Sequence, residues 1–202
     1  MWTPVHWIHD IPQGRLGIMP RPRGGDWLEV EASHLQRERV NILVSLLTAA
    51  EAAQLELQDE PAACAILQIE FVAFPIEDRG LPDSTHDYLA LVQTLAERLT
   101  TGDSIGIHCR QGIGRASMLA AGILRATGSA SHETWTRLQH ARGREVPDTE
   151  AQRLCVDRCF EQRARTIESS GAQTQKAPME SPSGLSCERG DSNPHSLAAT
   201  GT

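Results

Sequence analysis

Three short apolar runs, each with a helical stretch further along the chain, constrain the fold more than any other feature of this sequence. The runs are VNILVSLL at 40–47, IEFVAF at 69–74 and SIGIH at 104–108. Each has the length of a buried strand, and helical periodicity appears at 48–57, 84–101 and 114–127. Strands that alternate with helices form parallel sheets. The sequence therefore predicts an α/β fold, with a mostly parallel central sheet flanked by helices on both faces.

Shorter segments complete this alternation. Two more strands are predicted at Val5–Ile8 and Arg15–Met19, and further helices at Trp27–Arg39, Glu60–Leu67, Ser131–Arg142 and Thr149–Ile167. Polar residues stand where they would cap a following helix at Thr48, Asp83 and Asp148. Trp135 and Leu138 are predicted to be core residues.

The composition of the chain changes near residue 168. The segment 169–202 is rich in Ser, Gly, Pro, Thr and Gln and nearly empty of large apolar residues. Such a segment cannot bury enough apolar surface to offset the conformational entropy lost on ordering. We therefore expect one folded domain over residues 1–168 and a disordered tail over 169–202.

Charge and cysteine usage narrow the possible partners and compartment. The formal net charge is −7, which disfavours nucleic acid and anionic membrane surfaces as partners. The five cysteines include no CxxC pair, and no apolar run reaches the roughly 18 residues of a membrane span. We expect a cytoplasmic monomer. Five histidines show no metal-ligand spacing with cysteines or carboxylates: His6, His9, His86, His132 and His140. We therefore expect neither a metal site nor another cofactor.

The segment HCRQGIGR at 108–115 joins a predicted strand to a predicted helix. Cys109 and Arg115 are separated by five residues, which are Arg110, Gln111, Gly112, Ile113 and Gly114. A loop of this length can turn its amide N–H groups inward, because its glycines permit backbone angles that other residues resist. The start of the following helix adds the positive end of its dipole. These residues are therefore predicted to bind a phosphate, with Arg115 forking onto two of its oxygens.

The same positive field acts on Cys109. A cysteine that faces inward amide groups and an arginine is expected to be largely a thiolate at neutral pH. A thiolate beneath a bound phosphate is placed for in-line attack on phosphorus. Cys109 is therefore the predicted nucleophile.

The segment 108–115 matches the HCxxGxxR signature and resembles the cysteine-dependent protein tyrosine phosphatase superfamily. PRGG at 22–25 and PIEDRGLPD at 75–83 also resemble its dual-specificity branch, and especially the kinase-associated phosphatase group. The resemblance covers residues 1–168 and implies a parallel-centred sheet flanked by helices. It also implies that His108 supports the loop and does not act as a base.

The same resemblance implies further site residues. Asp78, which lies 31 residues before Cys109, corresponds to the general acid that protonates the leaving group and later activates water. Gln152, in VPDTEAQ, stands where relatives often carry a polar residue near the attacking water. The implied substrate is a phosphorylated protein, with phosphotyrosine favoured and phosphoserine or phosphothreonine left open.

One position departs from the family pattern. Relatives carry Ser or Thr directly after the arginine, whereas this chain has Ala116, followed by Ser117. In the family this hydroxyl supports the thiolate as it leaves in the second step. Its absence at Ala116 is therefore expected to slow breakdown of the phosphocysteine. A slow pseudophosphatase or phosphate-binding module is therefore an alternative. A rhodanese-like sulfurtransferase is a second one, because CRQG resembles the start of such loops.

Two further cysteines lie on the last predicted helix. Cys155 and Cys159 fall at i and i+4, on one face of that helix. Core packing is the favoured interpretation, and a redox role is the alternative.

Overall fold

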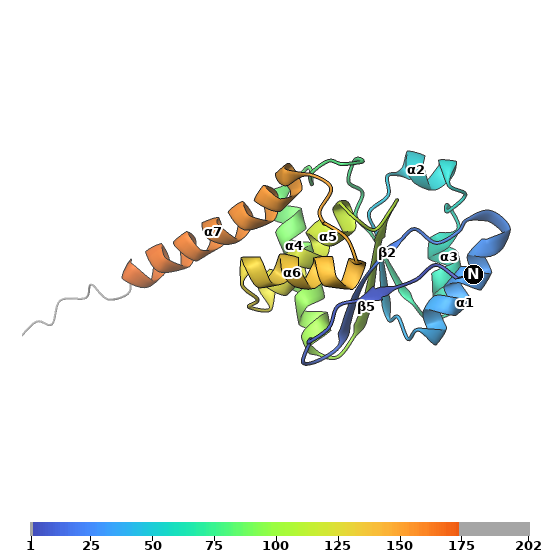
Figure 1. Cartoon of the computed structure of the whole chain (residues 1–202), viewed down its shortest axis with the longest axis horizontal. Coiled ribbons are helices and arrows are strands. Elements are labelled where there is room, and N and C mark those ends of the chain that lie inside the picture. Colours follow the sequence, from blue (N-terminus) through green and yellow to red (C-terminus); the bar gives the residue numbers. More distant parts are fainter. Residues whose placement is uncertain (1, 174–202) are drawn as a thin grey trace, which may run out of the picture.

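The computed structural model describes residues 2–173, with side chains through Glu161. Within this range lies a five-stranded sheet in the order β1-β2-β5-β3-β4 (Figure 1). The strands are β1 (His6–Trp7), β2 (Arg15–Pro20), β3 (Ile42–Ser45), β4 (Glu70–Ala73) and β5 (Ser104–Cys109). Only the pairing of β1 with β2 is antiparallel among these strands. The predicted mostly parallel sheet is confirmed.

The carboxyl ends of three parallel strands, β2, β5 and β3, lie together at one edge of the sheet, with β5 in the centre. Strand β5 pairs in parallel with β2 on one side and with β3 on the other. In this register Cys109 lies opposite Pro20, and His108 lies opposite both Met19 and Ser45. The loop that follows β5 therefore emerges at the edge where parallel sheets bind ligands.

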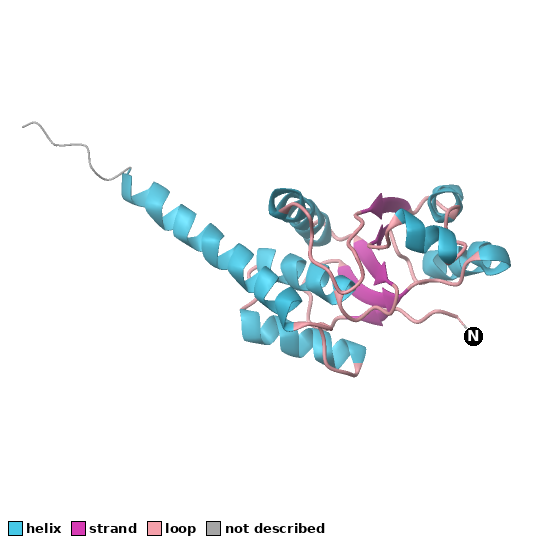
Figure 2. Ribbon diagram, turned by 90° about the horizontal axis from the view of Figure 1, so that it is seen from above, coloured by secondary structure: helices cyan, strands magenta, loops and turns pink. Residues whose placement is uncertain are grey.

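Helices cover both faces of the sheet, as the sequence predicts (Figures 1 and 2). One face carries α1 (Leu28–Arg37) and α3 (Glu60–Ile66), whereas the other carries α4 (Thr85–Thr100), α5 (Arg115–Ala126), α6 (Ser131–Arg142) and α7 (Glu150–Gln173). A short 3-10 helix, Gly25–Trp27, precedes α1, and α2 (Ala49–Gln54) follows β3. The predicted elements are all observed, with ends that differ by a few residues.

The helix α5 lies at the centre of the α4–α7 layer. It packs against β2, β5, α4, α6 and α7, and its residues from Arg115 to Leu124 are all buried. Small side chains permit this close packing: a Cβ at Gly122 would lie 2.5 Å from the hydroxyl of Tyr88. That hydroxyl donates to the Met118 carbonyl at 2.9 Å. Trp135 and Leu138 are buried in the same core, as predicted.

Helix capping confirms one prediction and corrects two. Thr48 caps α2 through a capping box, in which its hydroxyl accepts from the Glu51 amide and the Glu51 carboxylate accepts from the Thr48 amide. Asp83, however, is not the cap of α4, because the Ser84 hydroxyl accepts from the Asp87 amide. Asp148 is not the cap of α7 either, since the Thr149 hydroxyl accepts from the amide of residue 152.

The last helix extends further than its pattern predicts. The predicted span ends at Ile167, whereas α7 continues to Gln173, five residues into the segment predicted as a tail. Residues 174–202, with Cys187, lie outside the described residues. Over residues 2–173, no helix is long and apolar enough to cross a membrane.

Candidate active site

The predicted phosphate loop lies between β5 and α5, at the carboxyl edge of the sheet. Gly112 has a φ of +64°, and a Cβ there would lie 2.4 Å from the carbonyl carbon of Met19 in β2. Both the backbone angle and the close approach of β2 require glycine at this position. Glycine at position 112 is thus needed for the backbone angle of the loop, as predicted, and also for its contact with the neighbouring strand β2.

Arg142, at the end of α6, holds the outer side of this loop. Its Nε donates to the Gly112 carbonyl and its Nη2 to the Gln111 carbonyl, each at 3.0 Å. In a trans peptide the N–H points opposite to the carbonyl. The amides of Gly112 and Ile113 therefore point away from Arg142, toward the concave side of the loop. Nothing in the local sequence pattern around Arg142 indicated this role.

Cys109 lies at the base of a small pocket formed by this loop. Its side chain is almost buried, with an exposed fraction of 3%. The pocket has a volume of about 170 Å³ and is lined by Asp78, Arg79, Cys109, Arg110, Gln111, Arg115 and Asp148. The structure thus brings the predicted acid and nucleophile together, and adds Arg79 and Asp148, which the sequence had not assigned to the site.

Arg115 is held rigidly at the first turn of α5. Its guanidinium is 2% exposed and donates to both carboxylate oxygens of Glu51, at 2.7 and 2.9 Å. It also donates to the backbone carbonyls of Ile76, at 2.7 Å, and Leu46, at 3.3 Å. Burial disfavours the charged form, but the hydrogen bonds that Arg115 donates to Glu51, together with the electrostatic effects of Cys109, Glu51 and Asp78, outweigh it and raise the pKa of Arg115. The side chain is therefore a fixed cation at the pocket.

Glu51 is a site residue that the sequence reading missed. It belongs to the capping box of α2 and also forms the bidentate ion pair with Arg115, which is 64 residues away in the sequence. Burial alone would raise the pKa of Glu51, but the hydrogen bonds from Arg115 and the Thr48 amide lower it. The capping spacing Thr48-x-x-Glu51 was the available signal, yet it indicates a helix start and not a partner for a distant arginine.

Asp78 reaches the pocket from an exposed loop. Its Oδ1 accepts from Arg115 Nη2 at 3.0 Å, while its side chain is 60% exposed. The loop turns tightly, because the Gly80 amide donates to the Glu77 carbonyl at 2.8 Å and Arg79 has a positive φ of 58°. In this arrangement the Asp78 carboxylate occupies part of the arginine fork. A bound phosphate would have to displace it from Arg115.

Gln152 connects three parts of the site. It is fully buried, and its Nε2 donates to the Gly80 carbonyl at 3.2 Å. Gly80 belongs to the loop 75–82 that carries the predicted acid Asp78, here called the acid loop. A Cβ at Gly114 would lie 2.8 Å from Gln152 Oε1 and from Asp148 Oδ2. Gln152 therefore lies beside the loop 108–115, and glycine at 114 leaves room for it.

His108 faces away from the pocket, into the interior. Its ring is fully buried, with Nε2 3.2 Å from Oε1 of the buried Glu60 on α3. A side chain in this position cannot reach a substrate in the pocket. The geometry therefore favours the supporting role predicted for His108.

The hydroxyl that relatives place after the arginine is not replaced. Ala116 is fully buried. The Ser117 hydroxyl is buried too, without a hydrogen-bond partner among the described residues. Because successive helical residues are rotated by about 100°, Ser117 does not occupy the direction of Ala116.

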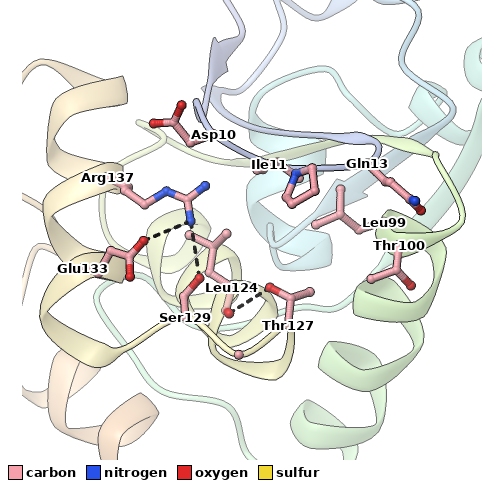
Figure 3. Close-up of a pocket in the computed structure, with 12 residues that line it drawn as sticks. Asp10, Ile11, Gln13, Leu99, Thr100, Leu124, Thr127, Ser129, Glu133 and Arg137 are labelled. Atoms are coloured by element: carbon pink, nitrogen blue, oxygen red, sulfur yellow. Dashed lines mark hydrogen bonds and ion pairs between the residues drawn. The ribbon is translucent and has the colours of Figure 1, made fainter.

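A larger cavity of about 400 Å³ lies at the other end of the sheet (Figure 3). Its walls include Ile11, Leu99 and Leu124, and Arg137 points into it between Glu133 and Ser129. No cysteine is among its lining residues. Since chemistry and not volume identifies an active site, we place the candidate site at Cys109.

Comparison with known proteins rests on structure. No family model matches the chain, and no curated protein matches it by sequence. The structure is similar to that of kinase-associated phosphatase with serine in place of the catalytic-site cysteine, with a TM-score of 0.70 and 16% identity over 81% of this chain and 97% of that chain. The active form of Tk-PTP gives a TM-score of 0.61 and 22% identity over 80% and 99%.

A third similar structure is the human tyrosine phosphatase-like serine/threonine/tyrosine-interacting protein. Its TM-score is 0.55, with 14% identity over 76% of this chain and 93% of that chain. At these identities the likeness shows the fold alone. The resemblance inferred from the motifs is thus confirmed for the fold: this chain has the α/β fold of the protein tyrosine phosphatase-like and dual-specificity phosphatases.

Proposed function

We propose that this protein hydrolyses phosphate monoesters of phosphorylated proteins, with phosphotyrosine as the preferred group, through a phosphocysteine intermediate. The observation that carries the proposal is the pocket in which Cys109, the fixed cation of Arg115 and the carboxyl group of Asp78 meet. Inward amides and Arg115 would hold the phosphoryl oxygens, and these donors neutralise the charge that develops during transfer.

In the first step the Cys109 thiolate attacks phosphorus while the bond to the leaving oxygen breaks. That oxygen departs with the electron pair and takes a proton from Asp78. For this step the Asp78 side chain leaves Arg115, and the phosphate takes its place on the guanidinium. The free-energy cost of this movement is small, because Asp78 is exposed and an ion pair with an exposed partner contributes about 1 kcal/mol or less.

In the second step a water molecule attacks the phosphocysteine. The Asp78 carboxylate takes a proton from this water, the bond between sulfur and phosphorus breaks, and the Cys109 thiolate and inorganic phosphate are released. The buried position of Gln152 beside Gly114 and Gly80 supports a role in holding the loops around that water.

The test is hydrolysis of p-nitrophenyl phosphate and of phosphotyrosine, phosphoserine and phosphothreonine peptides by the purified protein. Cys109→Ser is expected to abolish turnover. The matched control is Cys64→Ala, since Cys64 is a buried cysteine on α3 that is absent from the pocket lining. Equal activity of the Cys109→Ser variant and the wild type would refute the mechanism.

A second candidate, a slow enzyme that retains phosphate, is favoured by the arrangement at Ala116. Without a hydroxyl beside the departing thiolate, the second step would lose a hydrogen bond to a developing charge, which contributes about 1.5–3 kcal/mol. One structural neighbour is named as phosphatase-like and interacting, so the fold alone does not decide between turnover and binding. A burst of product followed by a slow steady state would support this candidate.

Ala116→Ser distinguishes the two candidates. If release of the thiolate limits turnover, the added hydroxyl should raise the steady-state rate about tenfold and leave the burst unchanged. A steady-state rate that does not rise would show that Ala116 does not limit the enzyme.

A further inference from the structure

Two cysteines that the proposed mechanism does not use lie one turn apart on α7. Cys159 is buried and packs in the main core, whereas Cys155 is partly exposed and lies at the edge of that core. The prediction of core packing thus fits Cys159 better than Cys155.

A pocket of about 310 Å³ opens over this pair. Its lining includes Cys155, Arg158 and Cys159 of α7, together with Leu81 and Thr85. Leu81 lies three residues after Asp78, in the same loop, and Thr85 begins α4. A small molecule can therefore reach the Cys155 sulfur, and anything attached there would lie against the segment that follows the catalytic acid.

The surroundings make Cys155 the more reactive of the two thiols. A hydrogen bond from the Cys159 thiol, together with the charge of Arg158, lowers the pKa of Cys155 to about 7, against the opposing effect of burial. The same hydrogen bond and burial raise the pKa of Cys159. By contrast, burial and the nearby Glu60 raise the pKa of Cys64 to about 12.

The two sulfurs cannot readily form a disulfide with each other. Side chains at i and i+4 on a helix have Cβ atoms about 5–6 Å apart, whereas a disulfide needs about 3.5–4.5 Å. Closing that gap would require α7 to unwind beside the catalytic site. Cys159 is therefore excluded as the disulfide partner of Cys155, and the pocket over Cys155 has room for a small molecule instead.

We propose that Cys155 is a site of reversible mixed-disulfide formation with a low-molecular-weight disulfide, held in the pocket between α7 and Leu81. The Cys155 thiolate attacks one sulfur of the reagent, the sulfur–sulfur bond of the reagent breaks, and the other half leaves as a thiolate. A free thiol reverses the reaction by the same exchange. The adduct restrains the loop of Asp78 and slows turnover, a consequence that rests on the proposed phosphatase activity.

The modification itself is tested without any activity measurement. Cys109→Ser protein is treated at pH 7 with 2,2′-dithiodipyridine, and the labelled peptides are identified by mass spectrometry. Among the cysteines of residues 2–173, Cys155 is expected to react first, while Cys64 stays unlabelled in the folded protein. Labelling of Cys155 no faster than Cys64 would overturn the site.

Two variants test why Cys155 reacts. Cys159→Ala removes the hydrogen-bond donor, so the thiolate fraction of Cys155 at pH 7 should fall about 15-fold. A thiolate of higher pKa is about fivefold more nucleophilic, so the labelling rate should fall only about threefold. Arg158→Gln changes an exposed residue and should slow labelling by a smaller factor. If neither variant slows labelling, the helix pair does not activate Cys155 and the proposal fails.

The effect on turnover is measured in wild type and Cys155→Ser. Both are labelled with tungstate present, so that a tetrahedral oxyanion covers Cys109, and are then freed of reagent and tungstate. Wild type should lose activity at least threefold and regain it with dithiothreitol, and Cys155→Ser should keep its activity. Full turnover in labelled wild type would overturn the restraint on the acid loop. Absence of phosphatase activity before labelling would instead refute the proposed function and leave the labelling result standing.

Discussion

The phosphate loop and the acid loop meet at one pocket, but they are held in different ways. The phosphate loop runs from the central strand β5 into the buried helix α5, and Arg142 and Glu51 fix its two sides. The acid loop carries the exposed Asp78. It is held by two hydrogen bonds to its backbone, from Arg115 to the Ile76 carbonyl and from Gln152 to the Gly80 carbonyl. This difference suggests a division of roles, in which one loop supplies a preformed anion site and the other supplies a proton by moving.

The largest effect is expected from Arg115→Lys. Lysine keeps the charge but loses the fork that engages Glu51 and the phosphate together. Loss of preorganised donors costs about 10²–10³ in turnover, so kcat/KM for p-nitrophenyl phosphate should fall by about 10³. Arg110→Lys is the control, because that guanidinium is partly exposed and lies 3.9 Å from Glu51. Comparable losses in both variants would contradict a special role for the rigid side of the site.

Asp78→Asn should give the next largest effect. Loss of a general acid should lower turnover of p-nitrophenyl phosphate by about 10², the lower end of the usual range, because its leaving group needs little protonation. The loss should be greater for phenyl phosphate, whose leaving group needs more. The melting temperature should stay close to that of wild type, because Asp78 is exposed. A large fall in stability would show that the acid loop is part of the rigid frame after all.

Glu51→Gln should mainly affect stability. It removes the charge that pairs with the buried Arg115, and we expect a loss of about 2 kcal/mol, between the values for exposed and buried pairs. Because folding lowers the pKa of Glu51, its contribution is complete above its ordinary pKa of 4.5 and is lost as the pH falls. Denaturant unfolding between pH 7 and pH 3 measures both quantities in wild type and variant. Glu77→Gln, in the acid loop, serves as the control.

The smallest predicted effect concerns anion binding. Asp78→Asn weakens the contact that occupies Arg115 in the ligand-free protein. An ion pair with one exposed partner contributes about 1 kcal/mol or less, so tungstate should bind up to about fivefold more tightly to the variant. Isothermal titration at pH 7 measures this change, and weaker binding would contradict the idea that Asp78 competes with the phosphate.

The sequence predicts best those features that depend on neighbouring residues. The segment 108–115 encodes its own turn through spacing and glycines, and the alternating apolar runs encode the sheet. Contacts between distant segments left no such signal. Glu51 pairs with Arg115 across 64 residues and Arg142 reaches back 30 residues to Gly112, and no periodicity links these polar side chains.

Errors at helix starts have a similar origin. Asp83 and Asp148 are good capping residues by type, but the hydroxyl of the following residue makes the hydrogen bond in each case. Asp148 lines the pocket at Cys109 instead. Residue type alone cannot distinguish two adjacent candidates, because the choice depends on where the chain enters the helix.

The burial of α5 also sets how the amide hydrogens of this domain exchange with solvent. Buried amides in the central helix should exchange only when the whole domain opens, whereas those of the loop 75–82 should exchange through local fluctuations. Moderate warming would then uncouple the proton donor from a nucleophile that is still in place. The native protein would lose catalysis through the acid loop before it loses the capacity to bind an oxyanion.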